Sequence, residues 1–266
     1  TTATLSLTAV PLATNGTLYR AQVSGTCSPA VTSNGALLTV QQSPVITTQP
    51  ANQIACEGST VTLSVVASGT GLSYQWYKGV TLLTGETSSS LSLSGVTAAT
   101  AGSYTVEVSG TCGGPVTSGA ASITINENPE ITGQPVSSVI CETGNTSFSV
   151  NAGVTTGATY QWQLSTDGGV TYTNVVNGGI YAGATTATLS LTAVPLATNG
   201  TLYRAQVSGT CSPAVTSNGA LLTVQQEPVI TLLPVNATIC ETNSVQFSVA
   251  ATGTGLTYLW REDGVP

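Results

Sequence analysis

Short runs in which apolar and polar residues alternate recur along this chain of 266 residues. Alternation with a period of two over four to eight residues is typical of a half-buried β-strand. Clusters of Gly, Pro, Asn and Ser separate the runs. Several short strands per hundred residues are typical of an antiparallel sandwich, so we expect an all-β protein. In the best-patterned stretch the runs predict strands at 45–48, 60–67, 72–77, 89–93, 103–109 and 116–125.

The same pattern is repeated along the chain. Residues 185–226 are identical to residues 1–42, which gives forty-two consecutive matches at an offset of 184. A weaker repeat opens at Pro44, Pro129 and Pro228, each within a Pro-x-Ile-Thr motif. Each opening leads to a Cys-Glu pair, then to an alternating run (61–65, 148–150 and 245–249), and then to a Tyr-x-Trp motif (Tyr74/Trp76, Tyr160/Trp162 and Tyr258/Trp260).

The units between the successive openings at Pro44, Pro129 and Pro228 are too long for the repeats of a solenoid. They indicate an array of whole domains. We assign residues 43–126 and 127–226 to two complete domains. Residues 1–42 correspond to the C-terminal half of a domain, and residues 227–266 correspond to the N-terminal half of another. We therefore interpret the chain as a segment of a longer protein.

Composition narrows the classes of function. Charged residues make up 6% of the chain, and four Lys and Arg against eleven Asp and Glu give a net charge of −7. Such a chain has too few cations to bind a nucleic acid backbone. It has no histidine and no run of eighteen apolar residues, so we expect no enzyme, no metal or cofactor and no membrane insertion in this segment. An uncharged surface rich in Thr and Ser is more usual in secreted β-proteins, and regularly placed cysteines suit an oxidising, extracellular setting.

Three motifs in the unit 43–126 carry a resemblance to a known fold. The sequences GSTVTLSV from Gly58, YQWYK from Tyr74 and AGSYTV from Ala101 resemble strands B, C and F of an immunoglobulin domain. The whole chain is similar to the bacterial immunoglobulin-like repeats of giant secreted adhesion- and gliding-associated surface proteins of the Bacteroidota type. The resemblance implies tandem immunoglobulin-like antiparallel β-sandwiches arranged head to tail. It also implies core positions for Trp76, Trp162, Trp260, Tyr104 and Tyr203.

The chain departs from the immunoglobulin pattern at its cysteines. The cysteines that join the two sheets in that family would fall at Val65 and Val106, or at Val150 and Ala205 in the next unit. All four residues are apolar. We therefore expect packing to hold the cores together and the cysteines to serve elsewhere.

The immunoglobulin topology implies a pairing for these cysteines. Cys56 would lie in a turn at the end of the domain from which the chain leaves, and Cys112 in a loop at the opposite end, roughly 35–50 Å away. A disulfide requires Cα atoms within about 7 Å. In a head-to-tail array Cys56 would instead pair with Cys211 of the next domain, and the other cysteines would have partners outside this segment (Cys27, Cys112, Cys141 and Cys240). The alternative is pairing within domains, Cys56 with Cys112 and Cys141 with Cys211.

Four smaller features are interpreted as structural. The sequence Thr166–Gly169 predicts a hairpin turn rather than a calcium loop, because one carboxylate is too few for Ca²⁺. A glutamate follows each Cys of the Cys-Glu pairs, and we expect it to satisfy turn amides (Glu57, Glu142 and Glu241). Scattered tyrosines predict cross-strand packing rather than a sugar-stacking platform (Tyr77, Tyr172 and Tyr181). A cation could also lie on a ring face at Tyr203-Arg204.

The resulting hypothesis is a structural repeat segment, a stalk or extracellular filament of a large secreted cell-surface adhesin-like protein. Short linkers that end in Pro and disulfides between neighbouring domains would stiffen it. Its partners would be neighbouring copies of the same repeat, with lateral self-association into fibres. The alternative is a module that binds a surface glycan or protein through the loops between strands B and C and between strands F and G.

Overall fold

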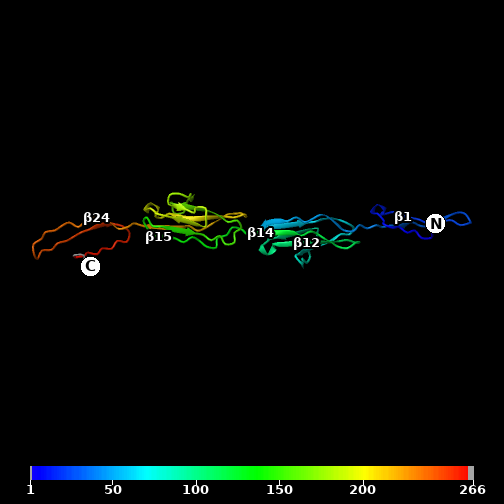
Figure 1. Cartoon of the computed structure of the whole chain (residues 1–266), viewed down its shortest axis with the longest axis horizontal. Helices are drawn as coiled ribbons and strands as arrows, with labels where there is room; N and C mark the ends of the chain where they lie inside the picture. The colour runs from blue at the N-terminus through cyan, green and yellow to red at the C-terminus, as the bar shows by residue number, and fades with distance from the viewer. Residues whose placement is uncertain (1, 263–266) are drawn as a thin grey trace. The chain divides into compact units, whose positions relative to one another are not determined.

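The computed structural model describes residues 2–262, and its regular secondary structure is almost wholly β-strand (Figure 1). The chain divides into two compact units, Thr1–Asn126 and Glu127–Pro266. Each unit contains one complete β-sandwich and one half-sandwich. Helical structure in the described part of the chain consists of three one-turn 3-10 helices, η1 (Leu12–Thr14), η2 (Ala98–Thr100) and η3 (Leu196–Thr198).

The first complete sandwich occupies residues 45–126. Its larger sheet has the strand order β10-β9-β12-β14-β6, with β13 paired to β12. The facing strands form two pairs, β7 with β11 and β5 with β8. The strands are β5 (Val45–Thr48), β6 (Gln53–Cys56), β7 (Thr60–Ser64), β8 (Val66–Ser68), β9 (Ser73–Lys78), β10 (Thr81–Leu82), β11 (Ser90–Ser94), β12 (Gly102–Ser109), β13 (Val116–Thr117) and β14 (Ala121–Asn126).

The core of this sandwich lies between its two layers. Trp76 on β9 is fully buried, and its indole N–H donates a hydrogen bond to the Ser88 carbonyl (2.9 Å). Tyr104 on β12 is buried, as the sequence predicts. Val65 and Val106, which take the places of the usual cysteines, are also buried. The two layers are therefore held together by apolar packing.

The second complete sandwich follows the same plan. One sheet has the order β15-β23-β21-β17-β18, with β22 paired to β21, and the other has the order β16-β20-β19. The strands are β15 (Ser138–Cys141), β16 (Thr146–Ser149), β17 (Thr159–Ser165), β18 (Thr173–Asn174), β19 (Tyr181–Ala182), β20 (Thr188–Leu191), β21 (Leu202–Ser208), β22 (Val215–Thr216) and β23 (Ala220–Gln225).

Three aromatic rings fill the centre of the second sandwich. Phe148 stacks on Tyr203 with ring centroids 5.0 Å apart, and it also lies 6.5 Å from the centroid of Trp162. All three side chains are buried. Val150 and Ala205, at the positions of the usual inter-sheet cysteines, are buried as well. Packing again replaces a disulfide in the core.

The half-sandwiches have little core of their own. Residues 2–42 form two short strand pairs, β1 (Leu18–Tyr19) with β4 (Ala36–Leu37) and β2 (Gln22–Val23) with β3 (Val31–Thr32). Residues 227–262 form one pair, β24 (Val229–Leu232) with β25 (Ala250–Thr252).

Two predictions in the last half-sandwich are wrong. Trp260 is 52% exposed rather than buried, because residues 227–262 contain no counterparts of β20, β21 and β23 to cover it. The strand expected at 245–249 does not form, since its counterpart β16 is held by a ladder to β20 in the complete sandwich. The same residue types thus lose their structure when their partners are missing.

Strand boundaries differ from the sequence pattern in two instructive places. The run 60–67 is two strands, because β7 pairs with β11 and then β8 pairs with β5 in another ladder. The run 116–125 is also interrupted, at Ser118. There the chain leaves the β13–β12 ladder, and the Ser118 hydroxyl accepts a hydrogen bond from the Val106 N–H (3.0 Å).

Candidate functional site at the ends of the domains

One class of cysteine lies where the chain leaves a sandwich. Strand β6 pairs in parallel with the last strand β14, and Cys56 lies directly opposite Asn126. The second sandwich has the same arrangement, with Cys141 on β15 opposite Gln225 on β23. The sequence predicts Cys56 at the correct end but places it in a turn. The short strand was missed because its four residues do not alternate with a period of two.

The other class of cysteine lies where the chain enters a sandwich. Cys211 follows Thr210, whose N–H donates to the Thr156 carbonyl (2.8 Å). Thr156 makes two hydrogen bonds with Glu127, the first residue of its unit. The Thr156 N–H donates to the Glu127 carbonyl (3.4 Å), and the Thr156 hydroxyl accepts from the Glu127 N–H (2.8 Å). Cys211 is therefore placed near the start of its sandwich, and it is buried.

Cys112 has the equivalent position in the first sandwich. It follows Thr111, whose N–H donates to the Thr70 carbonyl (2.9 Å). The Thr70 N–H donates to the Gln42 carbonyl (2.9 Å) just before the sandwich begins. Cys56 and Cys112 consequently lie at opposite ends of one sandwich, as the resemblance implies.

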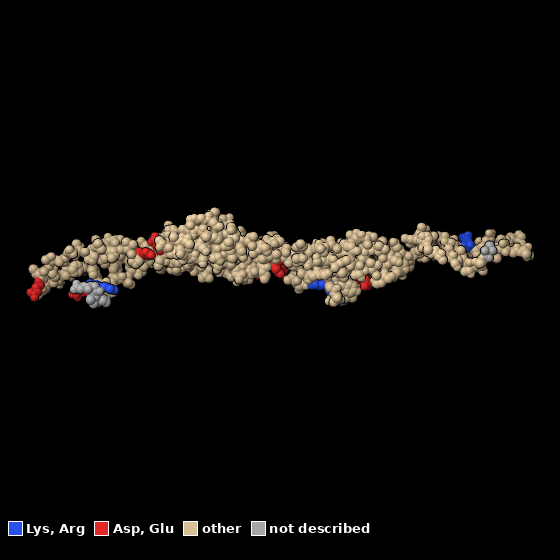
Figure 2. Space-filling view, viewed as in Figure 1, with Lys and Arg blue, Asp and Glu red and all other residues tan. Residues whose placement is uncertain are grey.

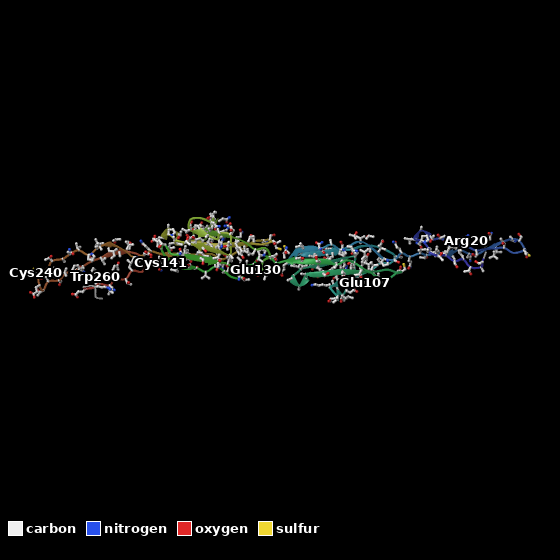
Figure 3. All side chains as sticks on the ribbon, viewed as in Figure 1. Arg20, Glu107, Glu130, Cys141, Cys240 and Trp260 are labelled. Atoms are coloured by element: carbon white, nitrogen blue, oxygen red, sulfur yellow. The ribbon has the colours of Figure 1, made fainter. Side chains whose placement is uncertain are left out.

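The cysteines also differ in their bonding state. Cys56 and Cys211 are disulfide-bonded. The other four cysteines of the chain are free thiols (Cys27, Cys112, Cys141 and Cys240). The alternative of pairing within domains is therefore wrong, because it requires Cys112 and Cys141 in disulfides. Figure 3 shows Cys240 where the chain of the last half-sandwich turns back on itself, and it shows Cys141 on the second complete sandwich.

The glutamates beside these cysteines take part through their backbone. The Glu57 N–H donates to the Asn126 carbonyl (3.0 Å), and the Glu142 N–H donates to the Gln225 carbonyl (2.8 Å). Both bonds extend the parallel ladder by one residue past the cysteine. They fix the cysteine against the last residues of the domain. The expectation that the glutamate carboxylates satisfy turn amides, which includes Glu241, stays a prediction.

The loop around Asp167 is a hairpin turn, as predicted. Strands β17 and β18 pair on either side of it. The Asp167 carboxylate accepts hydrogen bonds from the hydroxyls of Ser165 (2.6 Å) and Thr171 (2.5 Å) and from the N–H groups of Val170 (3.0 Å) and Thr171 (2.9 Å). These bonds, that of Ser165 first, hold the pKa of Asp167 well below its ordinary value. Among residues 2–262 no three His, Cys, Asp or Glu side chains gather in a way that could hold a metal ion.

The tyrosines considered as a sugar platform are engaged within their own domains. The Arg204 guanidinium lies 3.6 Å from the centroid of the Tyr172 ring, so Arg204 covers Tyr172 and not its sequence neighbour Tyr203. The Tyr181 and Tyr203 hydroxyls are hydrogen-bonded to each other (3.0 Å). Tyr77 lies in β9 opposite Leu82 and Thr105. These contacts favour packing over ligand binding.

The two buried core tyrosines are held differently. The Tyr104 hydroxyl donates to the Thr100 carbonyl (2.7 Å) on η2, a bond of the kind found in the tyrosine corner of immunoglobulin domains. The Tyr203 hydroxyl bonds to Tyr181 instead. Burial raises the pKa of both phenols, and the bond to Tyr181 raises that of Tyr203 further.

The surface carries few charges. Figure 2 shows acidic and basic side chains as isolated spots on an otherwise uncharged face. None of the described helices is long and apolar enough to cross a membrane. The exposed positions of the strands are instead filled largely by Thr and Ser.

Comparison with known proteins identifies the fold. Residues 43–109 match the family described as "Immunoglobulin domain", and residues 133–226 match the one described as "Domain of unknown function (DUF8696)". No curated protein matches the sequence. An I-band fragment of titin, I67–I69, is similar in structure at 16% identity with a TM-score of 0.56, over 80% of this chain and 76% of that one. The N-terminal eight immunoglobulin domains of the Down Syndrome Cell Adhesion Molecule are similar at 14% identity with a TM-score of 0.59, over 81% of this chain and 29% of that one.

The chain therefore contains two immunoglobulin-like β-sandwich domains in tandem, and the all-β prediction is confirmed. At such low identity the similar structures establish the fold and nothing about partners. Tandem domains of this kind are typical of structural and adhesion proteins, and no catalytic family matches.

Proposed function

We propose that this chain is a structural repeat segment, a stalk or extracellular filament of a large secreted cell-surface protein of the bacterial adhesin type. In this proposal a disulfide between Cys56 and Cys211 joins neighbouring domains and stiffens the array. The observation that carries it is the position of the two disulfide-bonded cysteines, one at the end of a domain and one at the start of the next.

The hydrogen bonds within each domain support this pairing. Cys56 lies opposite Asn126 at the end of the first domain. Cys211 is tied through Thr210 and Thr156 to Glu127 at the start of the second. Asn126 and Glu127 are consecutive residues, so both cysteines belong to the same junction. Because the other four cysteines are free thiols, each of the two has the other as its partner within the chain.

Such a bond would act as a covalent clasp beside a short linker. Pro129 follows the junction closely, and its ring fixes one backbone torsion. A cross-link between Cys56 and Cys211 closes the loop of chain that lies between these two residues. In the chain-entropy model such a cross-link adds about 5 kcal/mol to the free energy of unfolding. The two connections together would limit swivelling of one domain against the next.

The repeat and the surface chemistry support a structural role. Residues 1–42 and 185–226 are identical, including the loop that follows the strand ending at Ser208. Loops that bind different ligands would diverge, whereas spacers can stay the same. A surface of hydroxyl groups with few charges would also allow repeats to lie side by side with little repulsion. Disulfide-bonded cysteines suit an extracellular location.

The alternative, a module that binds a glycan or a protein, has less support. The ring of Tyr172 is covered by Arg204, and the hydroxyl of Tyr181 is bonded to Tyr203. A glycan array probed with the whole chain separates the two functions. Saturable binding to one class of sugar would favour the module.

Peptide mapping of the whole chain without reduction tests the clasp directly. We expect one peptide pair that contains Cys56 and Cys211. A bond between Cys56 and Cys112, or none at Cys56, would overturn the proposal. Stiffness is measured separately, from the distribution of distances between labels on the two domains. The distribution should broaden in the variant Cys56→Ser/Cys211→Ser and stay unchanged in the control Cys112→Ser.

A further inference from the structure

The second complete sandwich has a strand for which the first has no counterpart. In the second sandwich residues 175–187 connect β18 to β20, and they include β19, which pairs with β20. In the first sandwich the shorter segment 83–89, all of whose residues are described, connects β10 to β11 and forms no strand. Strand β11 therefore pairs with β7 along one side and has an open edge along the other.

Alternate residues of β11 direct their backbone groups toward this open edge. In the ladder of β11 with β7, the Val65 N–H donates to the carbonyl of Ser89, the residue opposite it (2.9 Å). In an antiparallel ladder such hydrogen-bonded pairs alternate with pairs whose N–H and carbonyl groups point away from the partner strand. Three serines therefore present their backbone groups at the open edge (Ser90, Ser92 and Ser94). In the described part of the chain these groups have no hydrogen-bond partner.

The second sandwich shows that the same edge accepts a further strand. Thr192 is the counterpart of Ser94, and its N–H donates to the carbonyl of Ile180, next to β19 (3.0 Å). Leu191 beside it is fully buried, whereas its counterpart Leu93 is only partly buried. The open edge of β11 thus lacks both the hydrogen bonds and the apolar cover that β19 gives to β20.

The composition of this edge favours pairing with a copy of itself. Charges, prolines and bulges usually keep strand edges apart. Residues 87–94 have the sequence TSSSLSLS, without charge or proline, and the ladder to β7 is regular. The strand itself, Ser-Leu-Ser-Leu-Ser, is the same in both directions about Ser92. Two-fold pairing places identical residues opposite each other, so it requires an edge without charge, and this edge has none.

We propose that β11 of one copy pairs antiparallel with β11 of a second copy about a two-fold axis at Ser92, so that two β7–β11 sheets join into one sheet. Ser92 lies opposite Ser92 of the second copy, and Ser90 lies opposite its Ser94. Each such pair exchanges two backbone hydrogen bonds. Leu93 of each chain gains Leu91 of the other as a neighbour on the inner face.

This pairing deepens the proposed function, on which it rests for the side-by-side arrangement of repeats. It assigns that arrangement to one strand and one register, and it does not depend on the clasp. Two five-residue strands bury a small area, so a single contact should be weak. Several such contacts between two filaments would act together through their high effective concentration.

Charge reversal at the centre of the strand tests the pairing in the whole chain. The Ser92 side chain is exposed, so Ser92→Lys and Ser92→Glu should leave the sandwich intact. Either variant alone places two like charges opposite each other, and its dimerisation constant, measured by sedimentation equilibrium, should be weaker by about tenfold or more. An equal mixture of the two variants should recover dimerisation, because unlike charges then lie opposite each other.

A matched variant controls for the added charge. Thr188→Lys introduces the same charge at an exposed position of β20, the strand whose edge β19 covers. Its dimerisation should equal that of the unsubstituted chain. Calorimetry should also find the same melting transition of the first sandwich in Ser92→Lys, Ser92→Glu and the unsubstituted chain.

Cross-linking tests the register with different residues. The background is a chain in which serine replaces the four free cysteines (Cys27, Cys112, Cys141 and Cys240). In a mixture of Ser90→Cys and Ser94→Cys chains the two thiols lie on opposite residues, with Cα atoms about 5.5 Å apart, and should form a disulfide. They release two protons and pass two electrons to oxidised glutathione, which leaves as two molecules of reduced glutathione. Ser90→Cys alone should link far less, because its two copies lie about 13 Å apart along the strands.

Three outcomes would overturn the pairing. The first is an unsubstituted chain that stays at 26.6 kDa up to about 1 mM. The second is a dimer that Ser92→Lys does not weaken. The third is a mixture of Ser92→Lys and Ser92→Glu that associates no better than either alone, together with equal cross-linking of Ser90→Cys alone and of its mixture with Ser94→Cys.

Failure of the proposed clasp would give a different pattern. A dimer with the expected charge response in a chain whose Cys56 is not bonded to Cys211 would overturn the clasp alone. A mapped bond between Cys56 and Cys211 in a chain that never dimerises would overturn the pairing of β11 alone.

Discussion

Replacement of Ser217 by alanine tests how a buried backbone group is satisfied where a strand is interrupted. The Ser217 hydroxyl accepts a hydrogen bond from the Ala205 N–H (2.8 Å) and donates one to the Asn218 carbonyl (2.9 Å). Ser217 and Ala205 are both buried. Alanine would leave the Ala205 N–H without an acceptor in the core, which costs about 1–3 kcal/mol of the free energy of unfolding. For a domain of this size, each kcal/mol lowers the melting temperature by about 4–8 °C.

The chain carries its own control for this substitution. Ser33 is the twin of Ser217 within the identical segment, and it makes the same two bonds, from the Ala21 N–H (2.9 Å) and to the Asn34 carbonyl (2.8 Å). Residues 21, 33 and 34 are exposed, so water can replace the lost hydroxyl. Ser33→Ala should change the free energy of unfolding by less than about 0.5 kcal/mol.

Differential scanning calorimetry of the whole chain can measure both substitutions. Ser217→Ala should lower the transition of the second sandwich. Ser118→Ala, which removes the equivalent bond to Val106, should lower that of the first. Equal losses of the free energy of unfolding in Ser33→Ala and Ser217→Ala would contradict this reasoning. They would show that the loss depends on the hydrogen bond itself and not on its burial.

Two further predictions concern titrating groups. The pKa of Tyr203 is raised above its ordinary value of 10.0, so the folded state keeps a proton that the unfolded state loses, and the second sandwich should lose stability as the pH rises above 10.0. Denaturant unfolding at increasing pH should show this loss, which should be smaller in Tyr203→Phe; a phenolate signal from Tyr203 in the folded domain near pH 10.0 would contradict it. The pKa of Asp167 lies below its ordinary value of 3.8, so its contribution to the hairpin is present above that pH and is lost as the pH falls through the folded-state value. Titration by NMR should find this carboxyl ionised below pH 3.8, and a midpoint at 3.8 would contradict the bonds from Ser165 and Thr171.

The fold was predictable from the sequence because its signals are local. Period-two alternation marked β7, β9 and β12, and the Tyr-x-Trp motif marked the strand that carries the buried Trp76. What alternation cannot show is which neighbour a strand will pair with. The change of partner at Val65 and the interruption at Ser118 depend on ladders to residues distant in sequence.

The candidate site was predictable in part. Placement of Cys56 and Cys112 at opposite ends followed from the topology that the motifs imply. The parallel pairing of β6 with β14 was not visible, because its four residues are too few for a periodic signal. At Trp260 the sequence signal is clear, because the Tyr-x-Trp motif is complete, but the predicted burial is wrong. The burial of this residue depends on strands that residues 227–262 do not include. The stacking of Arg204 on Tyr172 brings together side chains from distant parts of the sequence, and no local sequence pattern predicts it.

The sparsely charged surface should also make the hydration of the molecule depend little on pH and ionic strength. With no histidine, no side chain of this sequence has an ordinary pKa between about pH 5 and 8, and the two shifted kinds of group, Asp167 and the buried tyrosines, titrate still further from that window. Hydroxyl and amide groups do not respond to ionic strength as charges do. The exterior of these domains should therefore keep the same hydration and the same weak mutual repulsion in fresh water, in brine and in mildly acid surroundings.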